Sequence, residues 1–599
     1  MSKSETIGSK IDYLRPGTLK SESVLNWPPD VFCLCAAILQ ISGAYARVIE
    51  DLRPYLDGTT SHQRAISLRK IGARWKQTVS KRRPPPREIR AWWKAVLDHR
   101  TLPFHELSSV AATTCFSALL NLLGASDEAC AGIGIYKIDP QFRSKGGLDN
   151  FVFQAEGTLV ESLALGDQGA TLCRDIHPSR ARVLPKMHTP QNGLTIRSLS
   201  HHLAYCSGSD MQPNWVSLAT PQKSHSLNLL LIPWPHIVEP VQFVATTKRR
   251  VADYVPNGAY GLFTFAPTPA PAPSEVTAIL SEAIRQIGHI DGIVFPELSM
   301  TAEEFDPISD VVVTKERFLV AGVGRSATDV AGSNEAYIDV ADPNLNDRGE
   351  PVRYRFKQRK HHRWKLTKSQ IVQYGIGTTL HPEANWWEHI SLGHREISFV
   401  TLRPWLTMSV LICEDLARPD PVGEVVRAVG PNLIIALLSD GPQLNSRWPS
   451  RYAGVLADDP GSSVLTVTSA GMAKLSKSGD PAKDRPDVIA FWRDAKTGST
   501  EIVCPKDATA VVLNITAEYH EEWTADGRGD GINSGYPVLS GYHLIKRPDP
   551  AEGVSKHDYN YIPRSSDSLS SVQATSPGPE EGTHHETRSG SATHRRRPQ

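Results

Sequence analysis

The chain has 599 residues, of which 40% are hydrophobic and 22% are charged, and 65 basic against 64 acidic residues leave a net charge of +1. This length is enough for two or more hydrophobic cores, because single cores stop growing near about 250–300 residues. A net charge near zero gives no general argument for binding nucleic acid or acidic membranes. No stretch approaches the roughly 18 uninterrupted apolar residues of a membrane-spanning helix.

The cysteines and the first residues suggest a compartment. The cysteines are too sparse for a disulfide scaffold. Residues 1–6 are not followed by an apolar segment, so they do not resemble a secretory signal. We therefore expect reduced thiols and a cytoplasmic location.

The N-terminal third is predicted to be largely helical. Residues 1–28 are polar, and we expect them to be flexible. Over residues 31–124 apolar side chains recur with helical spacing, interrupted by the basic and proline-rich segment 81–87. The remainder of this part shows no clear period. Residues 29–222 are therefore predicted to form an α or α+β region, which is a candidate for binding an unknown partner.

Two cysteines and three histidines of this region suggest a zinc site. Their spacing is not that of a zinc ribbon or zinc finger, so we interpret them as partly buried side chains and predict no metal site. The residues are Cys173, His177, His201, His202 and Cys206.

From residue 225 onward, short apolar runs alternate with helical segments. The predicted strands are 227–232, 261–265, 290–295, 317–323, 335–340, 396–400, 406–412, 433–438, 463–468 and 510–515. The predicted helices are 275–286, with Ser274 as its cap, 422–429 and 450–458. This alternation predicts a layered α/β domain over residues 225–547. Residues 548–599 are rich in Ser, Pro, Gly, His and Arg, and we predict a disordered tail.

Three segments of the α/β domain end on residues that could perform chemistry. Glu297 follows the apolar run 293–296, Cys413 follows the run 410–412, and Lys360 lies between them in a basic segment. Catalytic groups favour the carboxyl ends of strands. A thiol nucleophile needs a base and a positive group, and these residues could supply both. Each also has a plain interpretation, as a structural thiol, a surface carboxylate and a solvated basic loop.

Taken together and in this order, the segments resemble the carbon–nitrogen hydrolase, or nitrilase, superfamily. Phe-Pro-Glu297 is similar to the glutamate segment of that family, and Lys360-His-His is similar to its Lys-x-His turn. Ile-Cys413-Glu-Asp resembles the nucleophile segment in the form found in the glutaminase portion of glutamine-dependent NAD synthetases. The resemblance covers about residues 225–547 and implies an α-β-β-α sandwich that pairs into a homodimer or higher oligomer.

Two assignments within this resemblance stay open. Lys357 and Lys365 are alternatives to Lys360 as the catalytic lysine. Many family members carry a second glutamate about ten residues after the lysine, but this stretch contains no acid. The candidates for that orienting role are Gln370, Glu383 and Glu388.

The resemblance also implies a mechanism. Glu297 deprotonates Cys413, whose sulfur attacks an amide carbonyl or a nitrile carbon, while Lys360 and the backbone N–H of Glu414 stabilise the negative charge. Glu297 then protonates the leaving amine and activates water on the acyl-thioester. The expected reaction is cleavage of a non-peptide carbon–nitrogen bond in a small molecule, with amides ahead of nitriles and no metal or organic cofactor. An active Cys413 is expected to react fastest of the eight thiols, through a lowered pKa.

Two other classes of function stay open. The chain could be a catalytically silent nitrilase-like sensor, an alternative motivated by the missing second glutamate and the unusually basic lysine segment. It could also be a nucleic-acid-associated protein, in which the N-terminal helices and residues 353–368 bind phosphates and the hydrolase-like domain processes a small molecule. The segment Gly322-Val-Gly324 resembles a phosphate loop only superficially, because it lacks the third glycine and the Lys-Ser/Thr ending.

Overall fold

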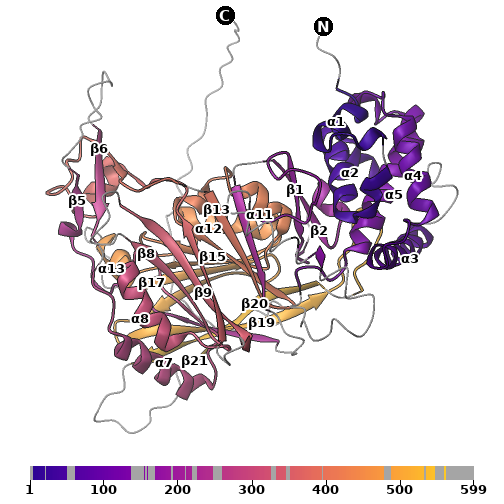
Figure 1. The fold of residues 1–599 in the computed structure, drawn as a ribbon. Coiled ribbons are helices and arrows are strands. Elements are labelled where there is room, and N and C mark those ends of the chain that lie inside the picture. Colours follow the sequence, from indigo (N-terminus) through magenta and orange to yellow (C-terminus); the bar gives the residue numbers. More distant parts are fainter. Residues whose placement is uncertain are drawn as a thin grey trace, which may run out of the picture. The chain divides into compact units, whose positions relative to one another are not determined.

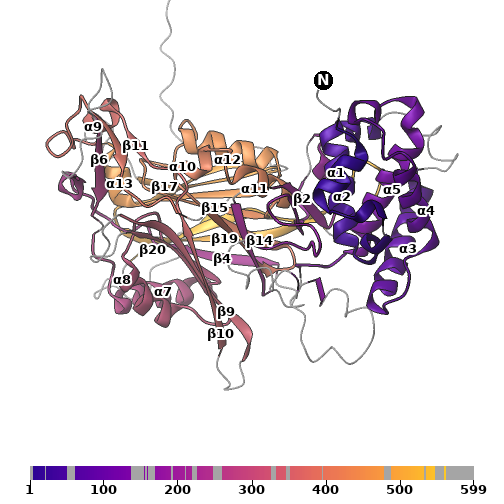
Figure 2. The same ribbon diagram turned by 45° about the horizontal axis from the view of Figure 1, so that its top comes forward.

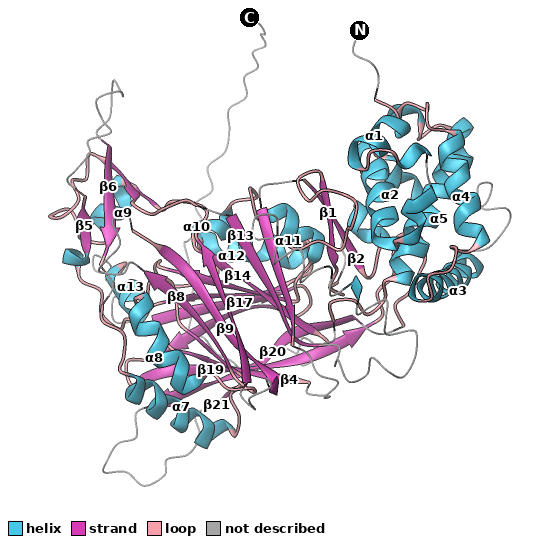
Figure 3. Ribbon diagram, viewed as in Figure 1, coloured by secondary structure: helices cyan, strands magenta, loops and turns pink. Residues whose placement is uncertain are grey.

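The structure is a computed structural model that describes residues 5–20, 22–49, 61–135, 154–155, 158, 169–190, 193–208, 211–218, 225–246, 260–266, 268–324, 332–345, 351–393, 395–477, 487–531, 534–546 and 559–561. Figure 3 distinguishes its helices and strands by colour. Within these ranges, no helix combines the length and the apolar character that crossing a membrane requires.

The N-terminal part is helical, as the periodicity predicts. Its α-helices are α1 (Ile7–Leu14), α2 (Pro28–Ser42), α3 (Ser61–Ser80), α4 (Arg87–Asp98) and α5 (Thr113–Ala129). Short 3-10 segments accompany them: η1 (Thr18–Lys20), η2 (Glu22–Asn26), η3 (Ala44–Ile49), η5 (Phe104–Glu106), η6 (Val110–Ala112) and η8 (Ile196–Leu199). Helices α2 and α5 are mostly buried, and α5 contacts α2, α3 and α4 (Figure 1).

The first helix corrects the prediction that residues 1–28 are flexible. Ile7, Ile11 and Leu14 follow one another at helical spacing, and each has 0% of its surface exposed. The hydroxyl of Thr6 caps the first turn. The overall polarity of this segment hid a short apolar face, and burial of that face orders the helix.

Three strands follow α5: β1 (Ala181–Pro185), β2 (Leu203–Ser207) and β3 (Met211–Ser217). β1 and β2 pair antiparallel with each other. β3 instead pairs in parallel with β13 (Arg395–Arg403), far along the chain. A strand from before residue 222 thus forms the edge of a sheet in the α/β part, while the domain limits themselves stay a prediction.

Two large sheets form the α/β part. The first runs in the order β10 (Pro351–Arg359), β9 (Asn334–Leu345), β8 (Phe318–Gly324), β7 (Gly292–Val294), β4 (Ser226–Leu231), β19 (Ala508–His520), β20 (Ser534–Lys546) and β21 (Tyr559–Tyr561). The second runs in the order β18 (Gly498–Cys504), β17 (Asp487–Asp494), β16 (Ser463–Thr468), β15 (Leu433–Leu438), β14 (Leu406–Ile412), β13 and β3. A small third sheet contains β11 (Lys365–Leu366), β12 (Asn385–Glu388), β6 (Tyr260–Phe265) and β5 (Phe243–Ala245).

The large sheets pack on each other and carry helices. The helices of this part are α7 (Pro273–Ile287), α8 (Ala302–Val312), α9 (Lys368–Gln373), α10 (Glu414–Ala417), α11 (Gly423–Val429), α12 (Trp448–Asp458), α13 (Ala470–Leu475) and the 3-10 segment η9 (Pro240–Gln242). β14 contacts β9 and β20, whereas α7 and α8 contact the first sheet and α10, α12 and α13 the second (Figures 1 and 2). Helix, sheet, sheet and helix layers result, which confirms the predicted mixed α/β class.

The best-predicted strands are those covered on both faces. β14, β15 and β16 pair in parallel, and every residue in them is buried. Strands covered on both faces read as continuous apolar runs. β10, β17, β18 and β20 were not predicted, because polar and apolar residues mix in them. Residues 353–359 of the basic segment therefore lie in strand β10, not in a loop.

The ends of two predicted segments differ from the structure. Helix α7 begins at Pro273, and its N-cap, Ala272, lies two residues before the expected cap at Ser274. The predicted disordered tail, residues 548–599, lies outside the described residues except for β21, which pairs with β20.

Candidate functional site

Glu297 is placed by the close packing of the backbone after β7 against its parallel neighbour β8. Glu297 follows β7, and the N–H of Gly322 in β8 donates to the carbonyl of Pro296 at 3.1 Å. A Cβ on Gly322 would lie 2.3 Å from the Cα of Glu297, so only glycine fits there. The glycine noted in the Gly322-Val-Gly324 segment therefore permits close packing beside Glu297. The next residue, Leu298, has a φ of 56°.

Lys360 brings a buried ammonium against two carboxylates. Its Nζ lies 2.8 Å from Glu297 Oε1 and 2.7 Å from Glu388 Oε2, and its side chain is 0% exposed. The backbone also fixes the lysine, because its N–H donates to the carbonyl of Asn334 at 2.9 Å. Of the three candidates for the second acid, Glu388 is thus the one that contacts the lysine.

Asn334 connects the two carboxylates and was missed by the sequence analysis. Its Nδ2 donates to Glu297 Oε1 and to Glu388 Oε1, both at 2.7 Å. Trp364 N–H adds a third donor to Glu388, at 3.0 Å from Oε2. The only available signal was position, since Asn334 begins the strand that pairs with β8 and β10.

One oxygen at this site has no partner. Glu297 Oε1 receives Lys360 and Asn334, but Glu297 Oε2 is buried and contacts no hydrogen-bond donor among the described residues. A buried acceptor without a partner costs free energy unless a substrate, water or thiol completes it. Oε2 is therefore the oxygen positioned to accept a proton.

Cys413 directly follows strand β14 and has a strained backbone conformation. It has a φ of 45° and a ψ of −106°, is 3% exposed, and precedes the four-residue helix α10. Its N–H donates to the carbonyl of Leu437 in β15 at 2.9 Å. Side-chain-bearing residues rarely adopt positive φ, and such outliers cluster at functional sites.

The charges of the three predicted catalytic residues act on one another. Burial and the charge of Glu297 raise the pKa of the Cys413 thiol well above its usual value, although Lys360 opposes this shift. Burial also raises the pKa of Glu297. Burial alone would lower the pKa of Lys360, but Glu297, Glu388 and Cys413 raise it well above its ordinary value. The structure thus brings Glu297, Lys360 and Cys413 together.

This electrostatic environment corrects the expectation of a lowered thiol pKa at Cys413. The shift is upward, because desolvation penalises the thiolate and a carboxylate lies nearby. The resting sulfur is therefore a neutral thiol, and its reactivity depends on proton transfer to a base.

Asp415 joins the nucleophile turn to the lysine turn. Its side chain is 0% exposed and accepts the N–H of His361 at 3.1 Å and the N–H of His362 at 3.0 Å. His362 Nδ1 lies 2.9 Å from Asp415 Oδ1. The residues that follow Lys360 are thus held by the acid two positions after Cys413.

The other lysine candidates lie at the surface. Lys357 is exposed, with its Nζ 4.8 Å from the ring centre of Tyr337. Lys365 is also exposed, and its Nζ lies 5.3 Å from the ring centre of Trp387. Neither has the buried carboxylate contacts of Lys360.

The remaining polar candidates have local roles. Gln370 forms a capping box with Thr367 at the start of α9. Glu383 is exposed and pairs with Lys368. The Glu414 side chain lies 3.3 Å from Arg418 within one turn. Gln370 and Glu383 are therefore not the second acid of this site.

A second polar group near Cys413 was not predicted. Asp440 accepts from Arg447 at 2.8 Å, from Trp448 Nε1 at 2.9 Å and from the Tyr374 hydroxyl at 3.3 Å. The charge of Asp440 contributes to the raised pKa of Cys413. Asp440 follows β15, the strand beside β14, so it reaches the same edge of the sheet.

The residues considered for a zinc site contact different partners and do not meet at one point. The backbone N–H groups of His201 and His202 donate to Asp127 at 2.8 and 2.9 Å, and Cys173 contacts Cys33. Among the described residues, no group of three or more His, Cys, Asp or Glu side chains is arranged to hold a metal ion.

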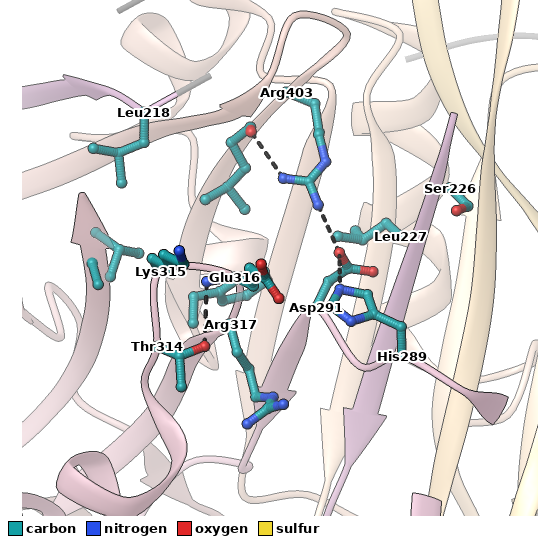
Figure 4. A pocket seen from close by; sticks show the side chains of 14 residues that line it. Leu218, Ser226, Leu227, His289, Asp291, Thr314, Lys315, Glu316, Arg317 and Arg403 are labelled. Carbon is teal, nitrogen blue, oxygen red and sulfur yellow. Dashed lines mark hydrogen bonds and ion pairs between the residues drawn. The ribbon is translucent and has the colours of Figure 1, made fainter. Parts of the chain in front are cut away.

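A separate cavity lies away from this site. It has a volume of about 410 Å³ and is lined around the starts of β4, β7 and β8 (Figure 4). Arg403 pairs with Asp291 at 2.6 Å inside it, and His289 lies 3.1 Å from the same acid. It contains none of the three predicted catalytic residues, and its main charges neutralise one another.

No family model and no curated protein matches this chain. Among solved structures, it is similar to the glutamine-dependent NAD⁺ synthetase of Acinetobacter baumannii, with 13% identity, 48% of this chain and 45% of that chain covered, and a TM-score of 0.28. The match therefore spans less than half of the synthetase.

Two further solved structures belong to the superfamily that the motifs resemble. Saccharomyces cerevisiae Nit3, a nitrilase-superfamily member, shares 11% identity over 55% of this chain and 93% of its own, with a TM-score of 0.26. A Helicobacter pylori carbon–nitrogen hydrolase shares 10% identity over 50% and 89%, with a TM-score of 0.23.

Proposed function

We propose that the chain is a thiol hydrolase of the nitrilase type, which cleaves a non-peptide carbon–nitrogen bond through an acyl-thioester on Cys413. The observation that supports this most is the buried contact of Lys360 with Glu297 and Glu388 beside a strained, buried cysteine. A buried ammonium held by two carboxylates is preorganised to stabilise charge that develops on a substrate.

In the first step, the Cys413 sulfur attacks the substrate carbon as its proton passes to Glu297. Oε2 is the oxygen of Glu297 that can accept this proton, because Oε1 already receives two donors. Since the pKa values of the thiol and the carboxyl are both raised, proton transfer accompanies attack and no thiolate needs to form beforehand. Lys360 and the backbone N–H of Glu414 stabilise the developing oxyanion.

In the second step, the protonated Glu297 gives its proton to the leaving amine, and the C–N bond breaks. The same carboxylate then takes a proton from water, which attacks the thioester and releases the acid and the thiol. The resemblance to the nitrilase superfamily favours amides over nitriles as substrates. The 3% exposure of Cys413 favours a small molecule over a peptide bond in a folded protein.

The catalytically silent alternative was motivated by the missing second glutamate and the unusually basic lysine segment. Glu388 lies 28 residues after the lysine and contacts its Nζ at 2.7 Å, which supports an active enzyme over a silent module. Asn334 and Trp364 donate to Glu388, which supports the proposal that Glu388 orients the lysine.

The basic segment also gives little support to phosphate binding at residues 353–368. Three of its four arginines are each paired with a carboxylate, which neutralises their charge, and the fourth, Arg363, donates to the backbone carbonyl of Glu388 at 2.8 Å. The pairs are Arg353 with Asp310 at 2.8 Å, Arg355 with Asp339 at 2.7 Å and Arg359 with Glu335 at 3.2 Å.

The test is hydrolysis of a panel of primary amides, ω-amides, nitriles and carbamoyl compounds by the wild type and by Cys413→Ala. We expect product from at least one amide, and a loss of about 1,000-fold or more in the variant. Unchanged circular dichroism and Tm would show that the variant is folded. Turnover that survives Cys413→Ala would contradict the proposal. Size-exclusion chromatography would test the predicted homodimer separately.

A further inference from the structure

A basic cavity opens in the N-terminal helical part, separate from the cysteine site. Its volume is about 920 Å³, and segments from η2, the end of α3, the start of α4 and residue 174 line it. Four arginines line it, Arg82, Arg83, Arg90 and Arg174, whereas Glu22 is the one acidic lining residue among the described positions. Because the whole chain has a net charge of only +1, this is a local concentration of positive charge.

Three of these guanidinium groups are uncommitted. Arg82, Arg83 and Arg90 are exposed and make no ion pair or side-chain hydrogen bond with any described residue. Other arginines nearby are paired; Arg74, for example, lies 2.7 Å from Glu88. Unpaired guanidinium groups around one cavity provide donors for an anionic ligand.

The strained backbone at Arg82 independently indicates that its side chain has a function. Helix α3 ends in a Schellman motif, in which the N–H of Arg82 donates to Val79 at 3.0 Å and the N–H of Arg83 donates to Thr78 at 2.8 Å. Arg82 occupies the left-handed position of this motif with a φ of 51°. Glycine adopts that conformation without strain, so arginine there destabilises the turn.

The segment that carries these arginines is rigid. Three consecutive prolines, residues 84–86, follow Arg83 and lead directly into α4, which carries Arg90. Proline fixes φ and restricts the residue before it. The backbone that carries these arginines thus has little conformational freedom left to lose on binding.

We propose that this cavity binds single-stranded nucleic acid through its phosphates. Guanidinium forks match phosphate oxygens, and their planar faces stack on unpaired bases. The guanidinium of Arg174 already stacks 3.4 Å from the ring centre of Trp27, so one flat cationic surface is in place. The cavity is far larger than a single phosphate requires, which favours several nucleotides.

The experiment measures fluorescence anisotropy of a labelled 20-nucleotide oligo(U) with the full chain over a range of salt concentrations. The test variant is Arg82→Gly/Arg83→Gln/Arg90→Gln, and the control is Arg100→Gln/Arg451→Gln/Lys496→Gln, which removes three exposed positive charges elsewhere. We expect the Kd to rise about tenfold or more in the test variant only. The slope of log K against log salt should fall by about 2, which corresponds to three phosphate contacts at about 0.7 each.

Arg82→Gly alone separates binding from folding. Because glycine relieves the strained turn, we expect its Tm to be equal to or above that of the wild type while its affinity falls. Cys413→Ala should bind as the wild type does, since the two sites are separate. Equal weakening in the test and control variants, or no binding at 50 mM salt, would overturn the proposal. Competition by ATP at the same phosphate concentration with equal potency would overturn the assignment to a nucleic acid strand.

Discussion

The Nζ of Lys360 lies 2.7 Å from Glu388 Oε2, although sequence spacing gave Glu388 no advantage over Glu383 or Gln370. This contact is buried, since the Glu388 side chain is 5% exposed and that of Lys360 is 0% exposed. A buried ion pair is costly to break, because the remaining charge stays desolvated.

Glu388→Gln should therefore reduce both activity and stability. We expect kcat to fall by about 100-fold or more, because Lys360 loses one of the two groups that orient it. The free energy of unfolding should fall by about 3 kcal/mol. Glu383→Gln is the matched control, and its exposed pair with Lys368 should contribute less than about 1 kcal/mol. Equal effects of the two substitutions would exclude Glu388 as the second acid.

Glu297→Gln should make the Cys413 thiol more acidic while it abolishes turnover. Burial and the charge of Glu297 raise the pKa of Cys413 and the charge of Lys360 lowers it, so neutralising Glu297 removes one of the raising effects and leaves the effect of the lysine in place. Iodoacetamide labelling of Cys413 from pH 7 to 10, followed by peptide mass spectrometry, should show the inflection at a lower pH in the variant. An inflection that stays in place or moves upward would show that Glu297 is not near the sulfur.

Asp415→Asn should lower activity by loosening the connection between the two catalytic turns. The substitution keeps the shape but weakens the charge-assisted hydrogen bonds from His361 and His362, which are worth about 1.5–3 kcal/mol each. We expect a lower Tm and a larger effect on kcat than on KM. Glu414→Gln changes the neighbouring acid, whose pair with Arg418 is partly exposed, and should leave Tm within about 1 °C. A normal kcat in Asp415→Asn would show that the connection is dispensable.

Asp30 should make the stability of the N-terminal part depend on pH. Burial and the charge of Asp175 raise the pKa of Asp30 from 3.8 to about 7. Between these two values the folded state keeps a proton that the unfolded state has lost, so stability is greatest below pH 4 and falls as pH rises to 7. The change amounts to about 4 kcal/mol at most.

Urea unfolding at pH 5, 6, 7 and 8 measures this effect. The wild type should lose free energy of unfolding relative to Asp30→Asn as the pH rises, so that its advantage over the variant shrinks or reverses. Asp98 is exposed and paired with Lys94, so the free energy of unfolding of Asp98→Asn should change with pH as that of the wild type does. A wild-type advantage that grows with pH would contradict a raised pKa at Asp30.

Much of the α/β part could be predicted because the amino-acid composition of its central strands shows that they are buried. Residues 406–412 were predicted as a strand and form β14 with the same limits. A strand buried on both faces must be apolar along its whole length, and this pattern is visible without a structure. The same reasoning placed Glu297 and Cys413 at strand ends, and the structure brings them into one electrostatic environment.

Contacts between distant segments could not be read from the sequence. Helix α1 was missed because three buried apolar residues lie within a polar stretch. Asn334 and Glu388 carry no motif, and their importance comes from hydrogen bonds that depend on strand pairing. The direction of the Cys413 pKa shift also depended on burial, which only the packed structure defines.

The amino-acid order by itself determined the layered fold class and the candidates Glu297 and Cys413, because apolar runs and the polar residues that end them are local features. Lys360 was chosen over Lys357 and Lys365 only through the resemblance to the nitrilase superfamily. Tertiary structure alone decided which acid contacts the lysine, which way the thiol pKa moves, and which arginines stay unpaired. Those properties depend on distances through space and on the exclusion of water, and neither follows from position along the chain.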